Sequence, residues 1–162
     1  MTIRAGERLP RGALMRVGDD GPETVDTEPL FAGRRVVLFG LPGAFSGTCT
    51  NLHLPGFVRV TSDLVRRGVQ GIVCVACNDP WVMRAWGEAT GASASGIQLL
   101  ADPSAEWIEA MGLLMEDRSM GFFRRSRRFA ALVEDGVVRV LNEEAHYDDC
   151  RASSGQRMAE LV

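Results

Sequence analysis

The segment RVVLFGLPGAFSGTCTNLHLPGF, residues 35–57, decides the fold. Its first part, residues 35–41, is a near-continuous apolar run, which is typical of a strand buried on both faces of a sheet. A loop rich in Pro, Gly, Ser and Thr follows, and then a helix is predicted over residues 48–67, with Gly68 as its C-cap. The segment therefore predicts a strand–loop–helix unit, with one cysteine, Cys49, where the loop meets the helix.

Strands and helices alternate along most of the chain and are followed by a hairpin and a last helix. Asp135-Gly136, between two apolar runs, is a strong hairpin signal. This order predicts an α/β fold, a central mixed sheet flanked by helices, with an N-terminal β extension and right-handed crossovers. Ligands of such sheets bind outside the carboxyl ends of strands, where Cys49 lies. The other predicted strands are Ala13–Val17, Gln70–Cys77, Ile97–Ala101, Phe129–Glu134 and Val137–Leu141, and the other predicted helices follow Asp79-Pro80 up to Gly91, follow Asp102-Pro103 up to Gly112, and cover Ser154–Val162.

The composition excludes several classes of protein. The 162 residues suit one domain spanning 1–162, and 46% of them are hydrophobic, enough to build a core. The formal charge of -3 gives no reason to expect binding to nucleic acid or to an anionic membrane. There is no lysine, which excludes a lysine Schiff base. No apolar run reaches the roughly 18 residues of a membrane span, and the N-terminal residues lack the apolar core of a signal peptide, so we expect a cytoplasmic protein with reduced thiols.

The surroundings of Cys49 favour a chemical role for its thiol. A helix N-terminus presents unpaired N–H groups and a partial positive charge, which stabilise a thiolate, the nucleophilic form of cysteine. The Ser46 hydroxyl can reach the sulfur or a substrate oxygen, and Pro42 offers an apolar wall without an N–H donor. The alternative is a buried cysteine that packs as a small hydrophobe. The residues alone leave both interpretations open.

Several motifs resemble one family of enzymes. Residues 42–57 resemble the active-site loop of the peroxiredoxin-5 (type II, atypical) family, whose pattern Pro-x-x-x-Thr/Ser-x-x-Cys is filled here by Pro42, Ser46 and Cys49. Ser46 stands where threonine is commoner, and Gly47 stands where many relatives have proline. Further similar blocks cover most of the chain in order: VACNDPWVMRAWG at 75–87, LLADPSAEW at 99–107 and RSRRFAALVEDGVVRVLNEE at 125–144.

The resemblance implies a thioredoxin-like fold and a thiol-dependent peroxidase. Cys49 would be the peroxidatic nucleophile, with Ser46, Pro42 and an arginine, by position Arg128, completing the catalytic site. A guanidinium is always charged and can hold both a thiolate and a peroxide oxygen. The alternative is that Arg128 belongs to a solvated basic loop. The family also implies a homodimer, a peroxide substrate, a reducing thiol, glutaredoxin or thioredoxin as reductant, and no cofactor or metal.

Four further residues are expected to contact substrate: Thr48, Gly43, Phe45 and His53. The amides near Thr48 and Cys49 would assist the reaction. His53, one turn after the cysteine, could instead have a structural role, and it has no partner at the spacing of a metal site. Apolar side chains near the loop suggest a dimer interface or a peroxide channel, with ordinary core as the alternative. They are Phe45, Trp81, Phe122 and Phe123.

The remaining cysteines have different expected roles. Cys74 and Cys77 form a C-x-x-C string, but on a strand residues three apart point to opposite faces, so they cannot pair. A zinc site would need two more ligands. Cys150 is a candidate resolving cysteine, although the neighbouring Asp148 and Asp149 would raise its pKa and make it a poor nucleophile. If Cys150 does not resolve, an external thiol reduces Cys49.

The predicted function is reduction of hydrogen peroxide or alkyl hydroperoxides through a cysteine sulfenic acid. One alternative is a peroxide-sensing redox switch without sustained turnover. A second is a protein disulfide reductase using Cys74 and Cys77. Catalytic loss of peroxide in the presence of a reducing thiol favours the enzyme over the redox switch. Loss of peroxide consumption in Cys49→Ser, with little effect of Cys74→Ser, counts against the disulfide reductase.

Overall fold

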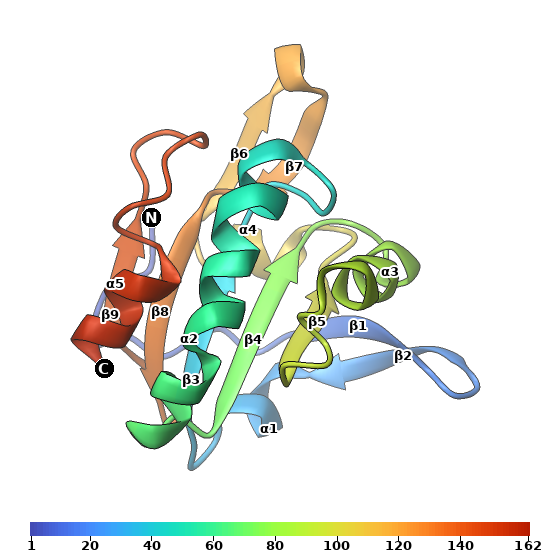
Figure 1. Ribbon diagram of the computed structural model, residues 1–162. Coiled ribbons are helices and arrows are strands. Elements are labelled where there is room, and N and C mark those ends of the chain that lie inside the picture. The colour runs from blue at the N-terminus through green and yellow to red at the C-terminus, as the bar shows by residue number, and fades with distance from the viewer.

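A seven-stranded mixed sheet of order β2-β1-β5-β4-β3-β8-β9 forms the middle layer of the computed structural model, which describes residues 1–162 (Figure 1). Its strands are β1 (Ala13–Gly18), β2 (Gly21–Asp26), β3 (Arg35–Gly40), β4 (Gly71–Ala76), β5 (Ile97–Ala101), β8 (Phe129–Glu134) and β9 (Val137–Glu143). A separate hairpin consists of β6 (Leu114–Asp117) and β7 (Phe122–Ser126). The helices are α1 (Thr27–Phe31), α2 (Leu54–Arg66), α3 (Pro80–Thr90), α4 (Glu106–Ala110) and α5 (Gly155–Leu161), with a π-helical turn η1 (Cys49–His53) and a 3-10 turn η2 (Arg118–Met120).

Strand β3 is central, parallel to β4 on one side and antiparallel to β8 on the other. Its side chains alternate between two cores: Val37 and Phe39 pack on one face of the sheet, and Val36 and Leu38 on the other. Residues 35–41 are almost all apolar because both faces of this strand are covered by other parts of the chain. The sequence prediction of a buried strand there is confirmed.

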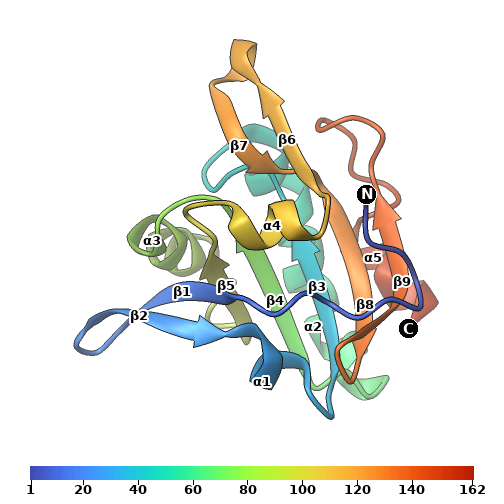
Figure 2. The same cartoon turned by 180° about the vertical axis from the view of Figure 1, so that it is seen from behind.

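Helices cover both faces of the sheet. Helices α2, α3 and α5 lie on one face (Figure 1), while α1, α4 and the N-terminal segment lie on the other (Figure 2). Trp86 and Met158 help to fill the first core, and Phe31 and Trp107 the second. This three-layer arrangement is the thioredoxin-like α/β fold that was predicted. None of the helices combines the length and the apolarity needed to cross a membrane.

Two elements of the N-terminal half, β2 and α1, were not among the predicted strands and helices. Strand β2 begins at Gly21, separated from the end of β1 by two residues, and pairs with β1 as an antiparallel strand. Strand β2 is a mostly exposed edge strand, so it shows no hydrophobic alternation, and an edge position tolerates Pro22. Helix α1 has five residues, too few for a periodic signal.

The β6–β7 hairpin was not predicted from the sequence, although it reaches the site. It projects beyond the end of the main sheet at which β3 and β4 terminate (Figures 1 and 2). Most of its residues are exposed or half-buried, so neither strand carries the alternation that marks a strand with one buried face. Charged and apolar residues are mixed along both strands instead, and this pattern is typical of a loop.

The helix predicted over residues 48–67 is present, but it opens with the π-helical turn η1. The amide of Leu54 bonds to the Cys49 carbonyl, five residues back. Pro55 has no N–H to donate to the carbonyl of Asn51, so the regular ladder cannot continue through this point. The proline therefore coincides with an irregular turn that begins at Cys49.

The contact between α2 and α5 gives a test of the packing. A Cβ at Gly155 would lie 2.6 Å from the Gly56 carbonyl oxygen, whereas a Cβ at Gly56 would meet nothing closer than 3.8 Å. Gly155→Ala should lower the free energy of unfolding by about 1–3 kcal/mol through overpacking. Gly56→Ala, the matched control, should raise it by up to about 1 kcal/mol through helix propensity. Urea denaturation of both variants measures this, and equal effects would contradict the close approach.

Candidate active site

Cys49 lies in the wall of a cavity of about 110 Å³ beyond the carboxyl end of β3. Cys49 is 1% exposed, and this cavity is where a reactant can approach it. Residues distant in sequence meet here, from the loop after β3, the β6–β7 hairpin, the start of β8 and the β9–α5 loop. The lining residues are Pro42, Ser46, Gly47, Thr48, Cys49, Met120, Phe122, Arg128, Tyr147 and Asp148.

The loop before Cys49 is held by hydrogen bonds at several points. The Ala44 amide donates to Asn78 Oδ1 at 2.9 Å, and Arg125 Nη1 donates to the Pro42 carbonyl at 3.1 Å. Ser46 Oγ donates to the Gly43 carbonyl at 2.6 Å. Because the Ser46 proton is used in this way, the lone pairs of its oxygen are available to accept a hydrogen bond from a molecule in the cavity.

The turn that carries Cys49 also supplies backbone donors. The Thr50 amide makes an i→i−4 bond to the Ser46 carbonyl at 3.0 Å. The amides of Thr48 and Cys49 precede it and so belong to the opening turn, where helical partners are missing. Negative charge at the Cys49 sulfur or on a bound oxygen is favoured at such a position.

Arg128 places its guanidinium against the sulfur. Nη2 lies 3.2 Å from Cys49 Sγ, and Nε and Nη2 both donate to the Tyr147 carbonyl, at 3.0 and 2.9 Å. Arg128 is only 2% exposed, and none of the ion pairs in the structure includes it. A buried cation without a carboxylate is costly, so a thiolate at Cys49 is the nearest available counter-charge. The solvated-loop alternative for Arg128 is therefore wrong, whereas Arg127 is exposed and pairs with Glu143.

His53 lies behind Arg128 and does not line the cavity. It is fully buried, with Nδ1 at 3.0 Å from Arg128 Nη1 and Nε2 at 2.9 Å from the Ser153 carbonyl. Burial, followed by the charge of Arg128, lowers the pKa of His53 to about 3. The imidazole is therefore neutral at physiological pH.

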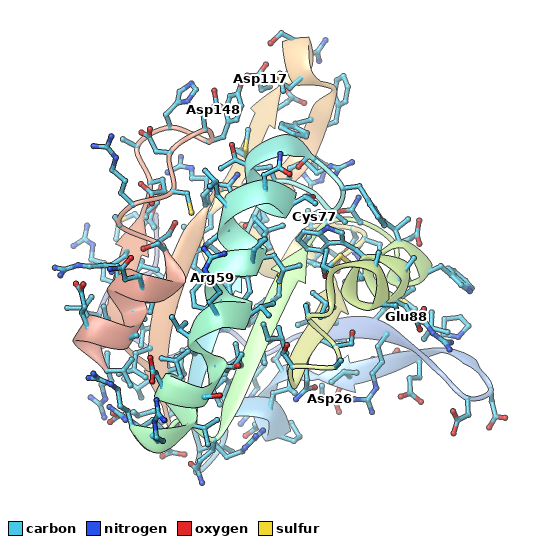
Figure 3. All side chains as sticks on the ribbon, in the orientation of Figure 1. Asp26, Arg59, Cys77, Glu88, Asp117 and Asp148 are labelled. Carbon is cyan, nitrogen blue, oxygen red and sulfur yellow. The ribbon has the colours of Figure 1, made fainter.

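The β9–α5 loop is fixed by one carboxylate. Glu144 Oε1 accepts from the amides of Arg151 and Ser153 and from Ser153 Oγ, at 2.7, 2.8 and 2.8 Å. This loop supplies the Tyr147 and Ser153 carbonyls that contact Arg128 and His53. Figure 3 shows Asp148, on this loop, at the same end of the molecule as Asp117 on the β6–β7 hairpin.

Comparisons with known proteins agree with this geometry. The redoxin family profile matches residues 4–155. The chain is 45% identical over 147 residues to peroxiredoxin-2E-2, chloroplastic, of Oryza sativa subsp. japonica, covering 88% of this chain and 65% of the length of that relative. A crystal structure of reduced Prx3 in complex with H2O2 from Vibrio vulnificus is 38% identical, with a TM-score of 0.92 and 99% of each chain covered.

The chain belongs to the redoxin family and is a peroxiredoxin. Peroxiredoxins are thiol-dependent peroxidases, so the predicted oxidoreductase function is confirmed. Peroxiredoxin 5 of Alvinella pompejana is also similar in structure, with 28% identity, a TM-score of 0.84, and 98% of this chain and 96% of that chain covered.

The predicted site residues of this peroxiredoxin divide into two groups. Pro42, Ser46, Thr48, Cys49 and Arg128 line one cavity, as the sequence suggested. The others lie outside it: Gly43 accepts the Ser46 hydroxyl, Phe45 is 56% exposed, and His53 is buried behind Arg128. The structure therefore does not place Gly43, Phe45 or His53 in contact with a molecule in the cavity.

Three lining residues from outside the active-site loop, Met120, Tyr147 and Asp148, were missed by the sequence reasoning, whereas Phe122 was suggested only for a peroxide channel or a dimer interface. Met120 and Phe122 come from the unpredicted β6–β7 hairpin, and Tyr147 and Asp148 from the irregular β9–α5 loop. The Phe122 and Tyr147 rings, which both line the cavity, meet edge to face with their centroids 6.0 Å apart. The one available signal was Phe122, which the sequence suggested for a peroxide channel.

The other three cysteines of the peroxiredoxin are also free thiols. Cys74 and Cys77 pack in opposite cores, as predicted from strand geometry. Burial raises the pKa of Cys74, and it raises that of Cys77 to about 12, so neither is a ready nucleophile. The pKa of Cys150 is raised too, but burial is the main cause and Glu144 contributes. The expectation that Asp148 and Asp149 would raise it is therefore wrong about the cause.

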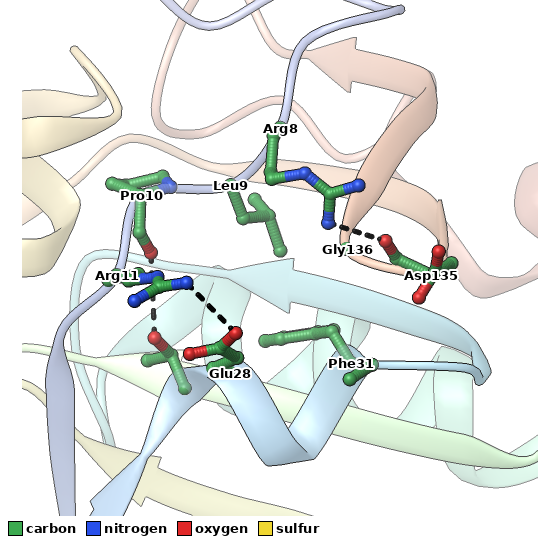
Figure 4. Close-up of a pocket in the computed structure, with 10 residues that line it drawn as sticks. Arg8, Leu9, Pro10, Arg11, Glu28, Phe31, Asp135 and Gly136 are labelled. Carbon is green, nitrogen blue, oxygen red and sulfur yellow. Dashed lines mark hydrogen bonds and ion pairs between the residues drawn. The ribbon is translucent and has the colours of Figure 1, made fainter.

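A larger cavity, of about 230 Å³, lies elsewhere on the peroxiredoxin (Figure 4). Leu9 and Phe31 are among its apolar lining residues, Arg11 pairs with Glu28 at its edge, and Arg8 donates to the Asp135 carbonyl. No cysteine lines it, so it lacks the thiol on which a thiol-dependent peroxidase relies. No cluster of three or more His, Cys, Asp or Glu side chains could hold a metal.

The buried histidine makes the stability of this peroxiredoxin depend on pH. The pKa of His53 is about 3 in the folded chain and about 6.5 when unfolded, so between these values only the unfolded chain binds the proton and stability rises with pH. Lowering the pH from 7 to 5 should cost about 2 kcal/mol through His53. Denaturation of wild type and His53→Asn measures it. The variant should lose less stability, and equal losses would contradict the assignment.

Proposed function

We propose that Cys49 is the peroxidatic cysteine and that Arg128 activates it. The observation that carries this is the 3.2 Å contact between Arg128 Nη2 and Cys49 Sγ at the wall of a cavity, with the guanidinium buried and unpaired with any carboxylate. Such a guanidinium stabilises a thiolate and can share its donors with a peroxide oxygen.

In the proposed reaction the Cys49 thiolate attacks one oxygen of the peroxide. A sulfur–oxygen bond forms and the O–O bond breaks, so the sulfur is oxidised to a sulfenic acid and the peroxide is reduced. The departing oxygen takes a proton and leaves as water or an alcohol. Charge on that oxygen is stabilised by Arg128 and by the amides of Thr48 and Cys49.

Ser46 and Pro42 prepare the substrate and the sulfur. Ser46 Oγ already donates to the Gly43 carbonyl, so its lone pairs are free to accept a hydrogen bond from a peroxide O–H. Pro42 lines the cavity with a ring and no N–H donor, which limits water at the sulfur. Phe122 and Met120 add an apolar wall that suits the tail of an alkyl hydroperoxide as well as hydrogen peroxide.

We propose that an external thiol, glutaredoxin with glutathione or thioredoxin, returns the Cys49 sulfenic acid to the thiol. The raised pKa of Cys150 argues against rapid attack by that residue. The peroxiredoxin-5 (type II) subgroup is our proposal for the finer classification, supported by the motif at residues 42–57. A cytoplasmic location stays a prediction.

A homodimer is also proposed, from apolar side chains around the active-site loop. Phe45, Trp81 and Phe123 are each more than half exposed, at 56%, 58% and 53%. Large exposed apolar groups indicate an interaction surface when they form one patch, and the dimer proposal requires these three side chains to do so. Sedimentation of wild type and Trp81→Glu tests it, and a wild-type monomer would overturn the proposal.

The role of Arg128 is tested by comparing Arg128→Gln with Arg127→Gln. Arg128→Gln removes the donor that faces the sulfur and should slow peroxide reduction by about 100- to 1,000-fold. The exposed Arg127 pairs with Glu143, and Arg127→Gln should keep wild-type activity. Peroxide consumption over many turnovers with a reducing thiol is the assay, with Cys49→Ser as the inactive reference. A single stoichiometric oxidation would favour the redox switch instead.

The fate of the sulfenic acid is tested by mass spectrometry after one equivalent of peroxide. One-cysteine chemistry predicts an added oxygen on Cys49, unchanged in Cys150→Ser. A Cys49–Cys150 disulfide in wild type, absent from Cys150→Ser, would show an internal resolver and overturn the proposal.

A further inference from the structure

Apart from the Cys49 sulfur, the hydrogen-bond partners of the Arg128 guanidinium are two neutral groups, the Tyr147 carbonyl and the His53 imidazole. Its Nε and one Nη2 bond go to the Tyr147 carbonyl, and its other amino group, Nη1, meets only His53. With no carboxylate to anchor it, the direction in which this buried fork points depends on these few acceptors.

The two contacts of His53 fix one tautomer of the imidazole. The Ser153 carbonyl can only accept, so Nε2 carries the proton and donates to it at 2.9 Å. Nδ1 then presents a lone pair to Arg128 Nη1, which can only donate, at 3.0 Å. The rings of Phe39 and Phe57, with centroids 5.2 and 5.5 Å from that of His53, confine its plane.

The two ends of the π-helical turn η1 meet the same guanidinium. Cys49 begins η1 and His53 ends it, four residues later. Nη2 faces the Cys49 sulfur and Nη1 faces His53. Because the guanidinium is planar and rigid, fixing Nη1 also fixes where Nη2 points.

We propose that His53 is a positioning residue, whose neutral Nδ1 holds the Arg128 fork so that Nη2 faces the Cys49 sulfur. This rests on the proposed function of Arg128. It replaces the expectation that His53 contacts substrate, because a ring that is 0% exposed and lies outside the cavity cannot do so. His53 acts on the reaction only through the arginine.

Kinetics of His53 variants test this dependence on Arg128. His53→Leu removes the acceptor and leaves a buried charged donor unpaired, so peroxide reduction should slow by about 10- to 100-fold. His53→Asn can still offer an oxygen to Nη1 and should recover most of the rate. A leucine variant as fast as wild type, or an asparagine variant as slow as leucine, would overturn the proposal.

A double-mutant cycle separates positioning from general packing. In the Arg128→Gln background His53→Leu should have little further effect, because the group that it positions is gone. The same slowing in both backgrounds would show that His53 acts by another route and would overturn the proposal. If Arg128→Gln itself were silent, the proposed function would fail first, which keeps the two failures distinct.

A measurement on the unmutated chain covers the case in which His53→Leu does not fold. The sequence has two histidines, so nitrogen-15 NMR of labelled histidine at pH 7 gives two rings, assigned with His146→Gln. His53 should be neutral with the proton on Nε2, and its Nδ1 signal should move in Arg128→Gln. A proton on Nδ1 would overturn the proposal, since that nitrogen could not accept from the guanidinium.

Discussion

The arrangement of the site depends on one buried cation, the guanidinium of Arg128, which is 2% exposed and has no carboxylate partner. Its burial is tolerated only because the Tyr147 carbonyl, the His53 lone pair and the Cys49 sulfur surround it. Of these, only the sulfur can become an anion. The sulfur is therefore the nearest group that could offset this buried positive charge, and the proposed role of Cys49 as a nucleophile rests on that arrangement.

The rest of the structure supplies this arrangement from distant parts of the chain. The loop that carries Cys49 begins where strand β3 ends. Pro55 lies just after the π-helical turn η1, whose first and last residues, Cys49 and His53, both contact the Arg128 guanidinium. Glu144 fixes the β9–α5 loop whose carbonyls hold Arg128 and His53. Local sequence thus determines each piece, and the site exists only when the sheet brings them together.

The sequence predicted what depends on local patterns. Strong apolar runs predicted the central strands, and strand geometry separated Cys74 from Cys77. The motif with Pro42, Ser46 and Cys49 predicted three residues that line one cavity. It could not predict the exposed β6–β7 hairpin, which has no periodic core face, or the π-helical turn, which is a backbone detail. The position of His53 was missed because its partners, Arg128 and Ser153, are 75 and 100 residues away in sequence.

The most direct test is the ultraviolet absorbance of the Cys49 thiolate at neutral pH, taken as the difference between wild type and Cys49→Ser and repeated in the Arg128→Gln background. If the buried guanidinium is what holds the charge on the sulfur, the difference should be clear in the wild-type background and should largely disappear in the other. An equal difference in both backgrounds would show that the thiolate does not depend on Arg128 and would contradict the account.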